Sequence, residues 1–323
     1  MIDTNNLSSE AVACLLCGSD RARSVHSGPD YFMHLPGTFQ LVRCDVCGLI
    51  YQSPRPPLAA IDRYYPDHYG SYTSAQAGLH ARPGLLGMII RRGQAKRCRM
   101  LSRAVPERPR QPRRLLDIGC ASGLFLEAMQ RYTGWQVEGV ELNATAAHAT
   151  SARLGVPVFA GPFEAARFPD ATFDAVTMWD VLEHLHDPVA GLREIRRILR
   201  PGGALFVRVP NANSYVAKLC GRYWVGYDLP RHMTVFGPQT LLRMLGEAGF
   251  DWPTTMFTSA SYLTILHSLH FALEDGRTSP TRAEAIHRIL LHPLARALAL
   301  PFCRVADVIA GGSALEVLAL RRG

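Results

Sequence analysis

The sequence predicts an α/β fold in which a doubly wound parallel sheet carries helices on both faces. An apolar run at residues 114–118 contains Asp117, a turn with Gly119 and Gly123 follows, and a helical pattern then begins. A second apolar run, residues 136–141, ends in Glu141, 24 residues after Asp117. Ligands bind at the carboxyl ends of strands in such sheets, so we expect these two loops to line one site.

The first loop favours a nucleoside over a dinucleotide as its ligand. A dinucleotide fingerprint would place glycine at positions 119, 121 and 124, but position 121 is Ala and position 124 is Leu. The two glycines still allow a sharp turn and close approach of a ligand to the main chain. A carboxylate at Glu141 can accept hydrogen bonds from both hydroxyls of a ribose.

Strand and helix signals alternate along the rest of the chain. Gly155 is a natural end for one helix, and Pro238 is a natural beginning for another. Strands are expected at 114–118, 136–141, 156–159, 173–179, 204–209, 252–258 and 313–320, and helices at 122–132, 143–154 and 238–250.

Four stretches in the correct order resemble the class I S-adenosylmethionine (SAM)-dependent methyltransferases, over about residues 113–258. They are residues 114–126, 169–176, 180–188 and 199–205. The resemblance implies a Rossmann-like sheet of seven strands. In this arrangement the last strand, 313–320, runs antiparallel between strands five and six.

The resemblance also implies which residues hold SAM. They are Asp117, Gly119, Cys120, Ala121, Gly123, Glu141, Leu142, Phe163, Glu164, Trp179 and Asp180. Phe163 or its backbone would flank the adenine, and residues 178–180 would border the methionine end. Two alternatives stay open: Glu164 as an exposed carboxylate at a helix start, and Cys120 as a small packed side chain.

Composition restricts the class of partner. The chain has 323 residues, 48% of them hydrophobic and 19% charged, and a net charge of +8. Residues 82–114 alone carry +10, so the remainder sums to −2 and a general nucleic-acid-coating role is not expected. The first 20 residues lack a signal-peptide pattern, and no uninterrupted apolar run reaches about 18 residues. A cytoplasmic location is therefore expected.

Cysteines near the N-terminus form two C-x-x-C-G knuckles. Cys14 pairs with Cys17 and Cys44 with Cys47, and 26 residues separate the two knuckles. Four thiolates in this pattern are typical of a structural Zn²⁺ site without an open coordination position. Two disulfides are the alternative, which a reducing compartment disfavours.

A subgroup of these methyltransferases carries such a zinc ribbon before the catalytic domain, and some of its members act on nucleotide-linked sugars. Residues 54–56 (Pro-Arg-Pro) and the tyrosines of 64–69 resemble this subgroup. The tyrosines would either reach the active site as lid residues or pack between ribbon and core. The expected domains are a zinc ribbon at 1–55, a linker and basic helix at 56–112, and a methyltransferase domain at 113–323.

The sequence allows more than one role for each of two segments. The basic helix at 85–105 could be a solvated cover over the cofactor mouth, a surface for an anionic substrate, or a membrane-surface helix. The helical insertion at 259–310 could cap the pocket, dimerise or make peripheral membrane contact.

Histidines are the candidate catalytic residues. The sulfonium methyl of SAM is already activated, so alignment contributes much of the rate, and a base is needed only for a poor nucleophile such as a hydroxyl or a carbon acid. His184 matches the family's Glu-His-Leu position, and His232 matches a pocket histidine of some ribbon-bearing members. In sugar C-methylating members the residues before that histidine include an acidic partner, whereas Pro230 and Arg231 stand here.

The sequence therefore predicts a SAM-dependent methyltransferase that acts on a small or carrier-linked acceptor, such as a sugar or a natural-product intermediate. An RNA or protein methyltransferase is the second hypothesis, with the ribbon and the basic helix holding the acceptor. A non-catalytic SAM- or zinc-binding scaffold is the third.

Overall fold

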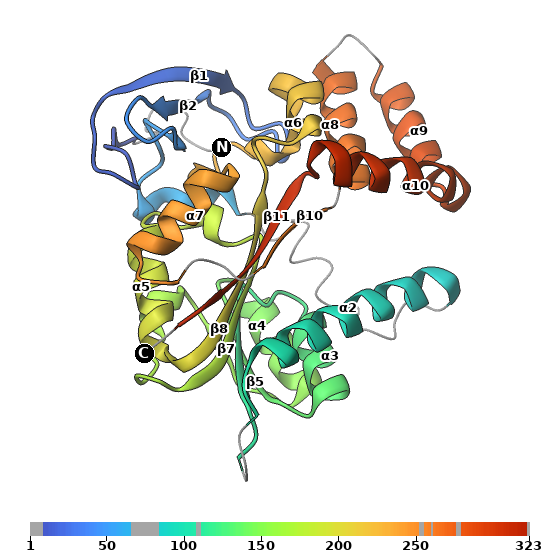
Figure 1. Ribbon diagram of the computed structural model, residues 1–323. Coiled ribbons are helices and arrows are strands. Elements are labelled where there is room, and N and C mark those ends of the chain that lie inside the picture. The colour runs from blue at the N-terminus through green and yellow to red at the C-terminus, as the bar shows by residue number, and fades with distance from the viewer. Residues whose placement is uncertain are drawn as a thin grey trace.

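Two β-sheets organise the chain in a computed structural model, which describes residues 9–65, 84–107, 111–251, 255–259, 261–275 and 279–321 (Figure 1). The larger sheet has seven strands in the order β10-β11-β8-β7-β4-β5-β6. These strands are β4 (Arg114–Ile118), β5 (Gln136–Glu141), β6 (Val158–Ala160), β7 (Phe173–Trp179), β8 (Leu199–Pro210), β10 (Thr255–Ser259) and β11 (Ala314–Leu320).

The predicted topology is confirmed. Strand β11 pairs antiparallel with β8 on one side and with β10 on the other, while β4, β5, β6, β7 and β8 pair in parallel. The expected strand at 204–209 proves longer, because β8 begins at Leu199. The third expected strand is shifted to 158–160, and residues 252–254 of the sixth lie outside the described residues.

Helices cover both faces of this sheet (Figure 1). Helices α2 (Gly84–Ala104), α3 (Leu124–Thr133) and α4 (Ala144–Leu154) lie on one face, and α5 (Pro188–Ile198) and α7 (Pro238–Glu247) on the other. The central strand β7 is buried along nearly its whole length, as expected for a parallel strand covered on both faces.

The helix ends follow local chemistry. The Asn143 side chain accepts a hydrogen bond from the Ala146 N–H and caps α4, and Gly155 ends it in a left-handed conformation. Asp187 caps α5 in the same way, with Pro188 in the first turn. These caps set where the loops at the carboxyl edge of the sheet begin.

The smaller sheet combines the N-terminal segment with a strand from far along the chain. Its order is β1 (Ala22–Gly28), β2 (Phe39–Cys44), β3 (Ile50–Gln52) and β9 (Thr234–Val235). Ile50 pairs with Val235 across β3 and β9. This pairing connects the N-terminal segment to the loop that contains His232.

Short helices and the expected insertion complete the architecture. They are η1 (Leu58–Tyr64), η3 (Phe163–Ala165), η4 (Leu182–His184), α6 (Tyr215–Cys220), η5 (Gly221–Tyr223), η6 (Val225–Tyr227), α8 (Ser261–Asp275), α9 (Pro280–Leu291) and α10 (Pro293–Ala310). Among the described residues, no helix combines the length and apolarity that crossing a bilayer requires. Most of the linker, residues 66–83, lies outside the described residues, including Pro66–Tyr69 of the tyrosine motif.

Candidate functional site

The β4–α3 turn needs its two glycines for a steric reason. Gly119 has a φ of +70°, and an added Cβ would lie 2.5 Å from Cγ2 of Val181. Gly123 has a φ of +65°, and its Cβ would lie 2.5 Å from Cγ2 of Thr150. Only glycine adopts both the left-handed backbone and the close approach without strain.

Glu141 is held by the two loops that it joins. One carboxylate oxygen accepts a hydrogen bond from the Ala121 N–H at 2.9 Å, and the other accepts from the Asn143 N–H at 3.0 Å. Burial raises the pKa of this carboxyl, which is only 4% exposed and lines the main cavity. Each oxygen retains acceptor capacity for a ligand hydroxyl.

A cavity of about 1080 Å³ opens at the carboxyl ends of the strands. It collects most of the residues that the resemblance assigns to SAM. Those that line it are Gly119, Ala121, Glu141, Leu142, Phe163, Glu164, Trp179 and Asp180.

The remaining predicted cofactor residues lie behind this lining. Asp117 accepts a hydrogen bond from the Thr177 hydroxyl at 2.7 Å, and burial raises the pKa of Asp117 to about 7. Cys120 is buried against Gly139, where a Cβ would meet its Sγ at 2.7 Å. Gly123 begins α3. These three residues support the turn instead of facing the cavity.

Trp179 closes one side of the site through ring contacts. Its ring centre lies 4.9 Å from that of Phe125 and 4.4 Å from that of Phe206. The Arg97 guanidinium of α2 lies 4.6 Å from the centre of the Trp179 ring. The basic helix therefore packs against the indole at the end of β7.

The other half of the cavity is built by segments far from the first turn. Leu58, Ile61, Asp62 and Tyr65 come from the N-terminal segment, Val225, Gly226, Asp228 and His232 from the loop after α6, and Thr264 from α8. The two tyrosines of the motif that the structure describes have different environments. Tyr65 lines the cavity, whereas Tyr64 is buried and its ring packs edge-on against Phe39.

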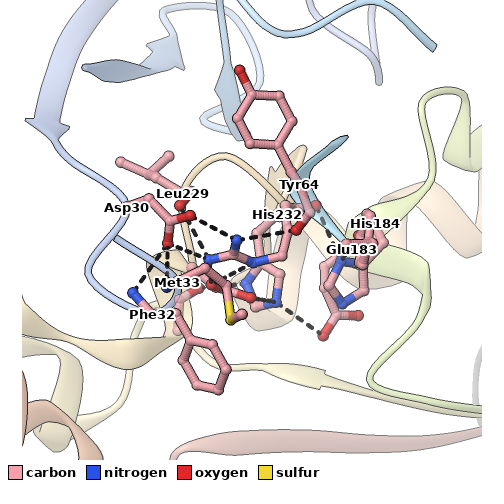
Figure 2. A network of polar contacts seen from close by, with 12 residues as sticks. Asp30, Phe32, Met33, Tyr64, Glu183, His184, Leu229 and His232 are labelled. Atoms are coloured by element: carbon pink, nitrogen blue, oxygen red, sulfur yellow. Dashed lines mark hydrogen bonds and ion pairs between the residues drawn. The ribbon is translucent and has the colours of Figure 1, made fainter. Parts of the chain in front are cut away.

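His184 and His232 face each other at this end, with ring centres 4.6 Å apart (Figure 2). Nδ1 of His184 lies 3.1 Å from the Arg231 carbonyl oxygen and 2.9 Å from the Tyr65 hydroxyl. Nδ1 of His232 lies 2.9 Å from the Gly226 carbonyl oxygen. Burial lowers the pKa of both rings, that of His184 to about 3, so both are neutral at pH 7.

Acids near His232 come from positions that sequence reasoning did not single out. Nε2 of His232 lies 3.8 Å from Asp228 Oδ2, one helical turn earlier in the chain, and 4.0 Å from Glu183 Oε1. The i−4 spacing of Asp228 was the available signal, but it is weak without the backbone turn at η6. The adjacent Arg231 turns away to ion pairs with Asp30 and Asp228.

The four knuckle cysteines meet in one cluster, and all are free thiols. Sγ of Cys14 lies 3.4 Å from that of Cys47, and Sγ of Cys17 lies 3.6 Å from that of Cys44. Four thiolates around Zn²⁺ with bonds of about 2.3 Å would place their sulfur atoms about 3.8 Å apart. The cluster therefore fits a tetrahedral zinc ion.

Comparisons with known proteins identify the family and the fold. A family model described as a methyltransferase domain matches residues 89–253. A ubiquinone biosynthesis O-methyltransferase of Chromobacterium violaceum is 32% identical over 171 residues, which cover 49% of this chain and 73% of the relative. One from Thiobacillus denitrificans is 29% identical over 191 residues, covering 55% and 81%.

A solved structure shares the fold. It is described as a sarcosine dimethylglycine methyltransferase from Galdieria sulphuraria, with a TM-score of 0.51 and 13% identity. The match covers 81% of this chain and 98% of that one.

Proposed function

The chain belongs to the methyltransferase domain family and is a SAM-dependent methyltransferase, and we propose that it methylates a hydroxyl group of a small or carrier-linked acceptor. One observation carries the proposal. A single cavity joins the strand ends at Gly119 and Glu141 to the histidine pair, His184 and His232. Donor and acceptor can therefore meet inside one cavity.

The donor half of the cavity suits an adenosyl group. SAM brings a methyl group that is already activated on a sulfonium. Glu141, fixed by two backbone N–H groups, accepts the ribose hydroxyls. Four of the residues that line this half of the cavity are Phe163, Glu164, Trp179 and Asp180. In the proposed binding mode, Phe163 and Glu164 would lie along the adenine, and Trp179 and Asp180 would border the methionine end.

The acceptor half combines an apolar wall with a polar end. Leu58, Ile61 and Val225 supply apolar contacts, and the histidine pair lies beyond them. This lining favours a hydroxylated ring with apolar surface, such as a natural-product intermediate, and a carrier-linked sugar is the second candidate. The relatives named above are O-methyltransferases, which agrees with an oxygen nucleophile.

A neutral hydroxyl is a poor nucleophile, so the acceptor must lose its proton or have its pKa lowered as the methyl group arrives. His184 and His232 are the residues that we assign to this step. Their neutral rings can activate the acceptor hydroxyl in two ways, by accepting its proton directly or by binding a cation that polarises it.

The cysteine cluster has a structural role in this proposal. Zn²⁺ held by Cys14, Cys17, Cys44 and Cys47 would stabilise the smaller sheet. The segment after β3, which ends at Gln52, contributes residues to the acceptor half of the cavity. The pairing of β3 with β9 connects the smaller sheet to the loop that contains His232.

Labelled SAM incubated with a panel of acceptors tests the proposal. The panel contains phenolic and catecholic rings, nucleotide-linked sugars, bulk tRNA and a protein extract. Transfer of label to a hydroxylated small molecule is expected, and His232→Gln should abolish it while the affinity for S-adenosylhomocysteine stays within about threefold. Transfer only to RNA or to protein would reject the small-molecule acceptor.

A further inference from the structure

Three side chains at the acceptor end of the cavity bring possible metal-ligand atoms close together. A carboxylate oxygen of Glu183 and one ring nitrogen each of His184 and His232 all lie within 4.8 Å of one another (Figure 2). Glu183 is fully buried and His232 is 7% exposed. All three residues also line the cavity, so a ligand bound there would face the acceptor.

Backbone carbonyls fix the tautomer of His232. A carbonyl oxygen only accepts hydrogen bonds, so the Nδ1 that lies 2.9 Å from the Gly226 carbonyl must carry the proton. Nε2 of the neutral ring therefore has a free lone pair, and this atom faces Glu183 and Asp228.

Nδ1 of His184 lies 3.1 Å from the Arg231 carbonyl oxygen and 2.9 Å from the Tyr65 hydroxyl oxygen. When Nδ1 carries the proton and donates to the carbonyl oxygen, Nε2 keeps its lone pair. Metal-binding histidines in proteins commonly donate their second ring N–H to a backbone carbonyl, which sets the orientation of the coordinating nitrogen.

Glu183 completes a group of acceptors without a donor. Neither of its carboxylate oxygens has a hydrogen-bond partner among the described residues. The 4.0 Å from Glu183 Oε1 to Nε2 of His232 is too long for a hydrogen bond. A buried carboxylate without a hydrogen-bond partner is unfavourable, and burial raises the pKa of Glu183 accordingly. A cation bound beside Glu183 would stabilise its ionised form.

The charged side chains around the histidine pair also favour a bound cation. The positive charge closest in sequence to His232 is Arg231, and it is shared between Asp30 and Asp228. Asp180 and Arg208, which also act on Glu183, form an ion pair at 3.3 Å and cancel each other. When Glu183 is ionised, Asp30, Asp228, Glu183 and Arg231 sum to a net charge of −2. A divalent cation would neutralise them.

We propose that Glu183, His184 and His232 bind one divalent transition-metal cation at the acceptor end of the cavity. Two imidazoles and one carboxylate favour Zn²⁺, Fe²⁺, Co²⁺ or Mn²⁺ over Mg²⁺ and Ca²⁺, which prefer oxygen ligands throughout. Bonds of about 2.0–2.2 Å to such an ion place two ligand atoms about 3.3–3.6 Å apart in a tetrahedral site, and about 4.4 Å apart when they lie on opposite sides of the ion. The three ligand atoms lie within 4.8 Å of one another, so side-chain rotation must bring them closer when the ion binds.

This inference rests on the proposed function for the role of the cation. A cation held by Glu183, His184 and His232 would bind the acceptor hydroxyl at an open coordination position and lower the pKa of the hydroxyl, and the proton would pass to solvent water. The oxygen then forms a bond to the methyl carbon as the carbon–sulfur bond breaks, and the electron pair of that bond stays on sulfur. The products are the methyl ether and S-adenosylhomocysteine.

Metal stoichiometry tests the site without relying on activity. Purified protein is loaded with Zn²⁺, desalted and analysed for metal content. Two equivalents per chain are expected for the wild type, one at the cysteine cluster and one at the proposed site. Glu183→Gln and His232→Gln should each hold one. His186→Gln is the matched control and should hold two, because the Nε2 of His186 bonds the Pro56 carbonyl oxygen instead.

Mn²⁺ binding followed by electron paramagnetic resonance gives a second readout. Thiolates are soft ligands that Mn²⁺ does not favour, so the signal reports the nitrogen–oxygen site. Glu183→Gln should raise the Kd for Mn²⁺ at least tenfold. S-adenosylhomocysteine binding and methyl transfer are measured on the same samples.

The outcomes are distinguishable. One zinc equivalent in the wild type and in both variants, together with no specific Mn²⁺ binding, would overturn the cation site. If methyl transfer to a hydroxylated acceptor persists in that protein, the proposed function stands and direct proton acceptance by His232 replaces the cation. Two equivalents with transfer only to RNA would leave the site standing and reject the small-molecule acceptor.

Discussion

Asp30 and Arg231 are 201 positions apart and form a fully buried, two-pronged ion pair. The Arg231 guanidinium donates to Asp30 Oδ2 at 2.9 Å and to Asp30 Oδ1 at 2.6 Å. It also donates to Asp228 Oδ1, and Oδ2 of Asp228 lies 3.8 Å from Nε2 of His232. The N-terminal segment is thereby connected to the histidine loop through charge as well as through the β3–β9 pairing.

Asp30→Asn should destabilise the fold strongly. The substitution leaves Arg231 with one buried carboxylate in place of two, and breaking a buried ion pair lowers the free energy of unfolding by about 3–5 kcal/mol. Urea unfolding measures the change.

The exposed pair of Arg243 and Glu247 is the matched control, with side chains 47% and 49% exposed. Glu247→Gln should change the free energy of unfolding by less than about 0.5 kcal/mol. An equally small change for Asp30→Asn would contradict the role of the buried pair.

Glu141→Gln should weaken cofactor binding. The substitution keeps the side-chain shape but replaces one acceptor oxygen with a donor NH₂, which opposes the Ala121 or Asn143 N–H. A rise of at least tenfold in the Kd for S-adenosylhomocysteine is expected, about 1.4 kcal/mol. Isothermal titration calorimetry measures it.

Glu138→Gln on the same strand is the control, since Glu138 pairs with Arg114 instead of lining the cavity. Asp117→Ala should also weaken binding, through the turn that Asp117 supports from behind. Unchanged affinity in both Glu141→Gln and Asp117→Ala would refute the assigned cofactor site.

His184 should make stability depend on pH in the metal-free protein. Burial lowers its pKa from 6.5 to about 3 in the folded state, so the unfolded chain takes up the proton first as pH falls. This contribution is present above about pH 6.5 and is lost between about pH 6.5 and pH 3, with a slope of up to about 1.4 kcal/mol per pH unit.

Comparison with His184→Gln isolates that slope from the other titrating groups. Glu183, whose pKa burial raises, acts in the opposite direction but is present in both proteins. Urea unfolding at pH 6, 5 and 4 in the presence of a chelator should show a shallower loss for the variant. His148→Gln, at an exposed position of α4, serves as the control. Parallel curves for the wild type and His184→Gln would show that the ring titrates normally.

Removal of the zinc ion that we propose at the cysteine cluster should weaken the smaller sheet. Cys47→Ser takes one thiolate from the cluster, and structural zinc sites contribute directly to folding free energy. A lower unfolding temperature and the loss of one zinc equivalent are expected, by differential scanning calorimetry and metal analysis. Cys220→Ser, outside the cluster, should retain the zinc. A zinc content unchanged in Cys47→Ser would mean that the thiols do not form the site.

Several features of this protein could be predicted from the sequence because they depend on neighbours along the chain. The turn at Gly119 needs a left-handed backbone, Glu141 ends a strand, and the cysteine knuckles repeat one local spacing. The strand order, with β11 antiparallel between β8 and β10, followed from the resemblance and is confirmed.

Only the tertiary structure decided the acceptor end of the cavity. Asp30 meets Arg231, Tyr65 meets His184, and Asp228 turns back to His232. Burial among distant segments determines these contacts, and local propensity carries no information about it. The sequence by itself determined the fold and the candidate histidines. Packing decided which nitrogen of His232 keeps a lone pair, because the Gly226 carbonyl reaches Nδ1 only when the chain is folded.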